Sequence, residues 1–277
     1  MKVFKAAGLV VLFLGLALQV YAGGPYGEDR EKVILEGSTT VLPIAQAAAE
    51  TFMMKNPQVD VTVRGGGSGV GIASLIDGTC DIANSSRPIK DTELDKAVTN
   101  GRSPKACVIA MDGICVIVHP SNSVNALTMK QIKGIYTGAI SNWSQVGGPD
   151  KKIVVISRDS SSGTFEAFGT LALNSAKVRP DALMQASNQA IASTVSRTEG
   201  AIGYVGLGYL TPEVKAIDVD GVKASKETVL NNKYALGRPL FMYTNGEPRD
   251  EVKEFIDYIL SPDGQKMVEE QGFVRLK

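Results

Sequence analysis

Four short turns of serine, threonine, glycine and arginine each follow an apolar, strand-like run, and this repetition limits what the chain can fold into. The turns lie at residues 37–40, 65–69, 84–87 and 158–164. Helical patterns follow the first, second and fourth turns, and strands that alternate with helices predict a layered, parallel α/β sheet. Ligands of open α/β sheets bind beyond the strand ends, so we expect the four turns to contribute to one ligand site.

The turn at residues 158–164 has the sequence RDSSSGT and indicates which kind of ligand it suits. The first N–H groups of a helix lack partners and carry partial positive charge, so an anion is stabilised beside them. Ser162 and Thr164 add hydroxyl donors, and Gly163 lets the backbone come close. Arg158 can offer a bidentate fork to a tetrahedral oxyanion. The alternative interpretation is a serine-capped helix start beside a surface arginine.

The first 22 residues are typical of a secretory signal peptide. Lys2 and Lys5 precede an apolar core at residues 6–20, and Ala22 is a small residue at the cleavage point. We expect cleavage after Ala22, a periplasmic location and a flexible segment at residues 23–32. A membrane anchor is the alternative, although the apolar core is short for a span.

The charge balance argues against broad nucleic-acid binding. The chain has 29 basic and 29 acidic residues, and loss of Lys2 and Lys5 with the signal peptide leaves a net charge of −2. An anion site must therefore come from local geometry and not from a global positive field.

The sulfur and imidazole residues predict neither a metal site nor a cofactor. Cys80, Cys107 and Cys115 lie in apolar runs, so we expect buried free thiols, with one disulfide as the alternative. Their spacing does not suit metal binding, and His119 is the only histidine in the chain.

Apolar periodicity predicts the order of the elements. The predicted strands cover residues 33–36, 59–63, a segment around Ile82, 106–118 (one long strand or two), 153–156, 201–205 and 238–243. The predicted helices cover residues 41–55, 72–76, 91–100, 128–137, a segment from Phe165, 188–197, a segment containing 252–259, and 262–271. We expect two α/β lobes, formed by residues 33–118 with 241–277 and by residues 119–240, around a central cleft.

The succession GSTTVLP at 37–43, GSGVG at 67–71, SSR at 85–87 and RDSSSGT at 158–164 resembles the periplasmic phosphate-binding proteins of ABC-type phosphate importers. The likeness covers most of the mature chain and includes Trp143, AIGY at 201–204 and RPL at 238–240. It implies the type II periplasmic-binding-protein fold, with inorganic phosphate as the ligand and the transmembrane subunits of an ABC permease as partners. We also expect a monomer that is not an enzyme.

The resemblance also implies roles for individual residues. It carries over to the anion-binding positions Thr39, Thr40, Ser68, Arg158, Ser162, Gly163 and Thr164. We further expect Ser86 and Arg87 to touch the anion, with pairing of Arg87 to a surface carboxylate as the alternative. Asp159 is expected to orient Arg158, and its alternative role is to accept a hydrogen bond from protonated phosphate. Some members carry an aspartate in the third turn that accepts a hydrogen bond from protonated phosphate. Because this chain has Ser86 and Arg87 there, sulfate, molybdate and tungstate stay open as alternative ligands.

Three other classes of protein are alternatives to a binding protein. A serine hydrolase would need a base, and the only histidine, His119, precedes a proline. Residues 66–70 also lack the last glycine of a nucleophile elbow. No Gly-Lys-Ser/Thr follows the glycine run at 65–71, so a nucleotide-hydrolysing enzyme is not predicted. The third class is an extracellular scaffold or adhesin, for which a small anion would not matter.

Overall fold

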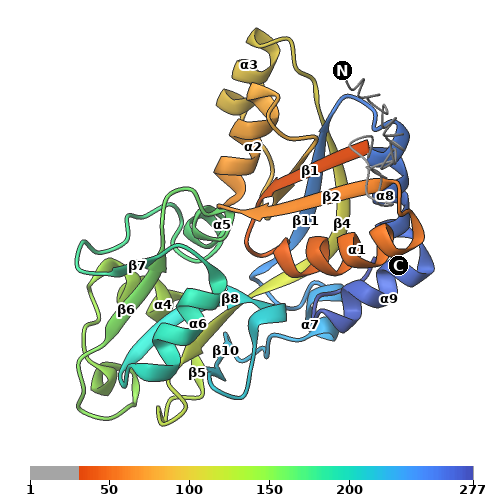
Figure 1. The fold of residues 1–277 in the computed structure, drawn as a ribbon. Coiled ribbons are helices and arrows are strands. Elements are labelled where there is room, and N and C mark those ends of the chain that lie inside the picture. Colours follow the sequence, from red (N-terminus) through yellow and green to blue (C-terminus); the bar gives the residue numbers. More distant parts are fainter. Residues whose placement is uncertain (1–30, 277) are drawn as a thin grey trace, which may run out of the picture. The chain divides into compact units, whose positions relative to one another are not determined.

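A mixed β-sheet runs through the part of the chain that the computed structural model describes, residues 31–276 (Figure 1). The predicted signal peptide at 1–22 and residues 23–30 lie outside the described residues, whereas Glu31 and Lys32 already belong to the first strand. The strands are β1 (Glu31–Gly37), β2 (Val59–Gly65), β3 (Ile82–Ser85), β4 (Pro104–Val118), β5 (Ala126–Leu127), β6 (Val154–Arg158), β7 (Leu183–Gln185), β8 (Ala201–Gly206), β9 (Lys215–Ala216), β10 (Asp218–Val219) and β11 (Gly237–Asn245).

The helices cover both faces of this sheet. They are α1 (Leu42–Lys55), α2 (Ser68–Asp77), α3 (Asp91–Thr99), α4 (Met129–Thr137), α5 (Gly163–Leu171), α6 (Asn188–Arg197), α7 (Lys226–Leu230), α8 (Asp250–Leu260) and α9 (Pro262–Glu270), with short 3-10 turns η1 (Trp143–Val146) and η2 (Leu207–Tyr209). None of these helices is long and apolar enough to cross a membrane.

The strand order is β2-β1-β3-β11-β4-β8-β6-β7, with β9 beside β4 and a separate β5–β10 pair. Strand β1 is parallel to β2 and β3, and β6 is parallel to β7 and β8. The expectation of an all-parallel sheet is wrong at the centre, because β11 runs antiparallel to both β3 and β4, and β4 runs antiparallel to β8. After β10 the chain returns to the centre of the sheet as β11, and it enters there in the direction opposite to that of β3 and β4.

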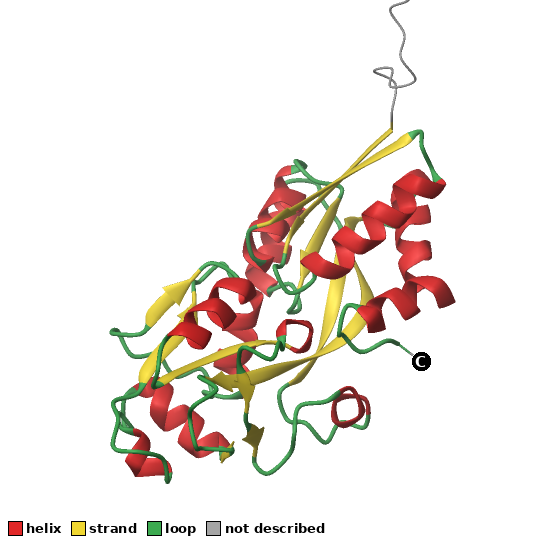
Figure 2. Ribbon diagram, turned by 60° about the horizontal axis from the view of Figure 1, so that its bottom comes forward, coloured by secondary structure: helices red, strands yellow, loops and turns green. Residues whose placement is uncertain are grey.

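Two large hydrophobic clusters lie along this sheet, between the strands and the helices that Figure 2 distinguishes by colour. One contains α1, α8, α9 and the inner faces of β1 and β2, and the other surrounds β6, β8 and the second half of β4. Strand β4 passes from the first cluster at Ala110 to the second at Ile114, and the chain returns between Leu236 and Leu240. The division into two lobes with boundaries after residues 118 and 240 stays a prediction.

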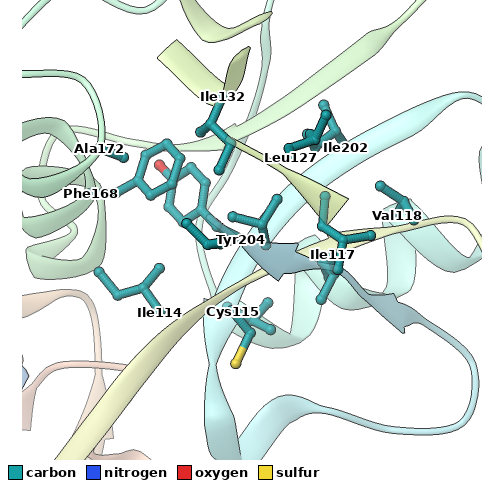
Figure 3. Packing of buried hydrophobic residues seen from close by; sticks show 14 of the residues in the cluster. Ile114, Cys115, Ile117, Val118, Leu127, Ile132, Phe168, Ala172, Ile202 and Tyr204 are labelled. Carbon is teal, nitrogen blue, oxygen red and sulfur yellow. The ribbon is translucent and has the colours of Figure 1, made fainter. Parts of the chain in front are cut away.

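An aromatic group in the second cluster fixes the end of β6 (Figure 3). The rings of Phe168 and Tyr204 stack with centroids 4.1 Å apart, and Tyr136 packs at the edge of Phe168. The Tyr204 hydroxyl lies 2.9 Å from Oγ of Ser157 and accepts the backbone N–H of Arg158 at 3.1 Å. The packed ring therefore holds the strand end from which Arg158 projects.

Most of the predicted elements are confirmed, with differences at their ends. Residues 106–118 form one strand, which resolves the alternative of two. Helix α2 begins at Ser68 instead of residue 72, because Gly67 with its φ of 101° already precedes the first helical turn. The three cysteines are free thiols, and Cys80 and Cys115 are buried as expected. The expected burial is wrong for Cys107, which is only partly buried because the first residues of β4 are exposed.

Candidate functional site

The N-termini of four helices carry residues that meet one another at one side of the sheet. Thr40 precedes α1, Ser68 and Gly163 open α2 and α5, and Asn188 opens α6. Oγ1 of Thr40 lies 2.9 Å from Oγ1 of Thr164, although 124 positions separate them in the chain. The turns predicted from the sequence to share a site are therefore in direct contact.

Glycine allows the turns to approach closely. A Cβ added to Gly163 would lie 2.2 Å from Oγ of Ser68 and 2.8 Å from Oγ of Ser86. Gly67, with its positive φ, would place a Cβ 2.6 Å from the carbonyl oxygen of Ser161. No larger side chain fits at either position without displacing a neighbouring turn.

The hydroxyls at the helix starts have backbone hydrogen bonds as well as free protons. Oγ of Ser162 accepts the N–H of Phe165 at 3.1 Å, so it caps α5, as the alternative interpretation of this turn supposed. Oγ of Ser68 accepts the N–H of Ser86 at 3.0 Å and lies 3.3 Å from Oγ of Ser86. A hydroxyl that accepts an N–H still has its own proton to donate.

Arg158 is a buried cation and not a surface residue, since only 1% of it is exposed. Its Nε donates to the carbonyl of Gln185 at 3.0 Å and its Nη2 to the carbonyl of Ala186 at 2.9 Å. Among the described residues no carboxylate forms an ion pair with it. Burial lowers the pKa of the Arg158 guanidinium, Asp159 and Tyr204 oppose this effect, and repulsion from Arg238 lowers it further.

Asp159 does not hydrogen-bond to Arg158. Its Oδ1 accepts the backbone N–H of Ser161 at 2.8 Å and also the hydroxyl of Ser161. Asp159 therefore does not orient Arg158 by direct pairing, because the turn itself uses this carboxylate, and only its charge acts on the guanidinium.

Arg238 is the main residue that the sequence reasoning missed. Its Nε and Nη2 donate to Oδ2 of Asp112 at 3.1 and 2.8 Å, and its Nη1 donates to the carbonyl of Ser86 at 3.1 Å. Its Nη2 also reaches Oγ1 of Thr164 at 3.0 Å and Oγ1 of Thr40 at 3.4 Å. One guanidinium thus contacts three of the turns.

A signal for this ion pair exists in the sequence. Asp112 interrupts the apolar run of β4, and Arg238 stands in the predicted strand of β11. Burial raises the pKa of Asp112, and the positive charge of Arg238 opposes this effect. Two opposite charges in buried strands indicate a paired site, since neither is stable alone in the interior.

Arg87 lies beside these turns, but carboxylates surround it. It makes a bidentate ion pair with Glu93 at 2.7 and 2.8 Å. Its Nε lies 3.0 Å from Oε2 of Glu166, with an angle too bent for a hydrogen bond. Lys90 contacts the same Glu166 oxygen at 2.7 Å. The alternative in which Arg87 pairs with carboxylates therefore matches the geometry, and these four residues are called the ionic clasp below.

A cavity of about 470 Å³ adjoins the converging turns. Its lining includes Ser86 of the third turn, Arg238, and Arg87, Lys90 and Glu166 from the ionic clasp. The four turns and Arg238, called the turn cluster below, are therefore next to open space on the side where the ionic clasp lies.

The hydrogen bonds of the His119 ring are with Ser121 and not with residues of the four turns. Its Nδ1 accepts the backbone N–H of Ser121 at 3.2 Å and lies 2.7 Å from the Ser121 hydroxyl, in the loop that follows β4. No group of three histidine, cysteine, aspartate or glutamate side chains within residues 31–276 is placed to hold a metal ion.

Comparison with known proteins gives the class to which this fold and site correspond. A family model described as PBP superfamily domain matches residues 24–263. A substrate-binding protein from Clostridium perfringens, crystallised with bound phosphate, is 38% identical with a TM-score of 0.83, and the match covers 89% of this chain and 100% of that one. An ABC-type phosphate transport receptor from Vibrio cholerae is 33% identical, with a TM-score of 0.74 and coverage of 88% and 100%. The expected periplasmic-binding-protein fold is confirmed.

Curated relatives define the family more narrowly. The phosphate-binding protein PstS of Bacillus subtilis is 35% identical over 255 residues, which cover 90% of this chain and 82% of that protein. PstS of Borreliella burgdorferi is 36% identical over 263 residues, with coverage of 90% and 92%. The chain therefore belongs to the PBP superfamily and, within it, to the family of PstS phosphate-binding proteins.

Proposed function

We propose that this protein captures inorganic phosphate between the converging turns and delivers it to an ABC permease. The observation that carries the proposal is Arg158, which is buried and makes no ion pair with a carboxylate among the described residues, although the charge of Asp159 acts on it from outside pairing distance. A buried cation without an ion-pair partner is costly, and an anion bound beside it lowers that cost. Relatives named phosphate-binding protein support phosphate as this anion.

The spacing of the turns supports a ligand of only a few atoms. Thr40 and Thr164 are in hydrogen-bond contact, and Gly163 has no room for a methyl group. A nucleotide or sugar would force these turns far apart, whereas a tetrahedral oxyanion needs only a small separation. Hydroxyls and a guanidinium are the donors that an oxyanion requires.

We assign anion contacts to Thr39, Thr40, Ser68, Arg158, Ser162, Gly163 and Thr164, as the resemblance implied, and to Ser86, as we expected separately. Arg87 is the weakest member of the predicted set, because Glu93 and Glu166 already compensate its charge. Arg238 joins the set as a support for three turns.

The remaining parts of the proposal concern location and partners. We propose an exported monomer that acts outside the cytoplasm, loses residues 1–22 and passes phosphate to the transmembrane subunits of the permease. We also propose that it is not an enzyme, since the hydroxyls of the turn cluster have no imidazole beside them: the single histidine of the chain contacts Ser121 instead.

A second candidate is another tetrahedral oxyanion, namely sulfate, molybdate or tungstate. The third turn presents the Ser86 hydroxyl and no carboxylate, and a hydroxyl can donate to an unprotonated oxygen or accept from a protonated one. Such a group discriminates less against a fully deprotonated anion than a carboxylate does.

Calorimetric titration with phosphate, sulfate, molybdate and tungstate tests both candidates. We expect phosphate to bind most tightly and Arg158→Ala to weaken it at least tenfold, which needs only about 1.4 kcal/mol. Arg179→Ala is the matched control, because Arg179 is also largely buried but pairs with a carboxylate, that of Asp181. Identical titration curves for Arg158→Ala and the wild type would refute the role of Arg158.

A further inference from the structure

We infer that Asn188 and Arg238 are positioning residues that turn threonine hydroxyl protons toward the ligand, and so favour an anion with several unprotonated oxygens. Asn188 is fully buried and Arg238 is 5% exposed. Asn188 donates N–H groups to the hydroxyl oxygens of Thr39 and Thr40, and Arg238 donates to those of Thr40 and Thr164. The inference rests on the proposed function.

The side chain of Asn188 has only one satisfactory orientation. The backbone N–H of Gly206 points at its Oδ1 from 3.2 Å, and a backbone N–H can only donate. The other end of the amide must therefore be Nδ2, which lies 3.2 Å from Oγ1 of Thr39 and 3.0 Å from Oγ1 of Thr40. The two threonines thus receive N–H groups and cannot donate to Asn188.

Arg238 imposes the same direction from another side. A guanidinium has no acceptor, so its Nη2 donates to Oγ1 of Thr164 at 3.0 Å and to Oγ1 of Thr40 at 3.4 Å. The two contacts with Oδ2 of Asp112 and the contact with the carbonyl of Ser86 fix the plane of this group. Arg238 therefore cannot turn away without losing three other hydrogen bonds.

A hydroxyl that receives N–H donors has its own proton left to donate. Oγ1 of Thr40 and Oγ1 of Thr164 are 2.9 Å apart, so one can donate to the other, and the second proton still needs an acceptor. An anion that binds between these turns with a small separation can accept both protons. Donors that already point at the ligand lower the cost of ordering them on binding.

A double-mutant cycle separates this role from a merely structural one. We would titrate inorganic phosphate at pH 8 into the wild type, Asn188→Leu, Thr40→Val and the double variant. Asn188→Leu is expected to raise Kd about tenfold, the effect of one hydrogen bond to a charged group. In the Thr40→Val background the same change is expected to raise Kd less than twofold, because the hydroxyl through which Asn188 acts is gone.

Asn122→Leu is the matched control. Asn122 is also buried, and its Oδ1 accepts the N–H of Val124 in the loop after β4, away from the threonines. This variant is expected to leave Kd unchanged. If it weakened phosphate as much as Asn188→Leu, loss of any buried amide would explain the result and the inference would be overturned.

Asn188→Asp keeps an acceptor for Gly206 and provides a second cycle if the leucine variant does not fold. Its carboxylate takes the hydroxyl protons of Thr39 and Thr40, so we expect a loss of at least tenfold that shrinks severalfold in the Thr40→Val background. If the loss came instead from direct repulsion between the new carboxylate and phosphate, it would be equally large in the Thr40→Val background. Additive effects in the measured cycles would overturn the inference, whereas absence of phosphate binding by the wild type would remove the proposed function and the inference with it.

Discussion

The close contact between Gly163 and the turn at Ser68 predicts that one added methyl group disrupts phosphate binding without harming the fold. A Cβ on residue 163 would lie 2.2 Å from Oγ of Ser68 and 2.8 Å from its Cβ. The hydroxyl can rotate away, but the Cβ of Ser68 is fixed to the backbone. The start of α5 must therefore retreat before the turns can meet.

The magnitude follows from the cost of overpacking. Inserting a methyl group into a well-packed position costs about 1–3 kcal/mol, and the same figure corresponds to a rise in Kd of roughly 5- to 150-fold. Folding itself gains, because alanine is a better helix former than glycine by up to about 1 kcal/mol. Gly163→Ala should therefore bind phosphate weakly and melt no lower than the wild type when phosphate is absent.

Calorimetric titration and thermal melting of Gly163→Ala and Gly169→Ala check this reasoning. Gly169 lies in the same helix, and a Cβ added there meets nothing within 4 Å, so Gly169→Ala should bind like the wild type. Equal affinities for the two variants would show that close approach at residue 163 does not matter for binding.

Two predictions concern the ionic clasp. Glu166→Gln removes a negative charge that compensates Arg87 and Lys90 beside the proposed anion site, so it should lower Kd for phosphate about two- to fivefold, since partly screened ion pairs contribute about 0.5–1 kcal/mol. The effect should disappear in 1 M salt and be absent for Glu199→Gln, which breaks an exposed pair; a gain of affinity that ignores salt would contradict it. Burial raises the pKa of Glu93, but hydrogen bonds from Arg87 and Lys90 outweigh it and the pKa lies below its ordinary 4.5. Because the pKa of Glu93 is lowered in the folded state, its charge stabilises the fold above pH 4.5, and this stabilisation is lost as the pH falls through the folded pKa. Urea unfolding should therefore give free energies of unfolding for the wild type and Glu93→Gln that converge in acid. A constant difference between them from pH 7 to 3 would refute this reasoning.

The sequence predicted the turns because their signals are local. Serine, threonine and glycine at a strand end determine a helix start whatever packs around it, and α1, α5 and α6 begin within two residues of the predicted points. The same local signals indicated that Thr40, Ser68 and Thr164 would share a site, and these residues lie in the turn cluster.

Partners that are distant in the chain could not be predicted in this way. Arg87 pairs with Glu93 nearby in the chain, but its second carboxylate, that of Glu166, is supplied by α5 from another segment. Asn188 looked like an ordinary first helical residue, and only the positions of Thr40 and Gly206 give its amide a role. The direction of β11 likewise depends on the path of the whole chain and not on its own residues.

The pairing of β4 with β11 has a consequence for how the chain reaches this structure. Arg238 and Asp112 are 126 positions apart, yet they belong to neighbouring strands that are paired along nearly the whole length of β11. Closing so large a loop is slow, because its entropy is lost before the ladder begins to form. The segment between these strands must therefore collapse largely on its own, and its return to β4 is the step that we expect to limit the rate of folding.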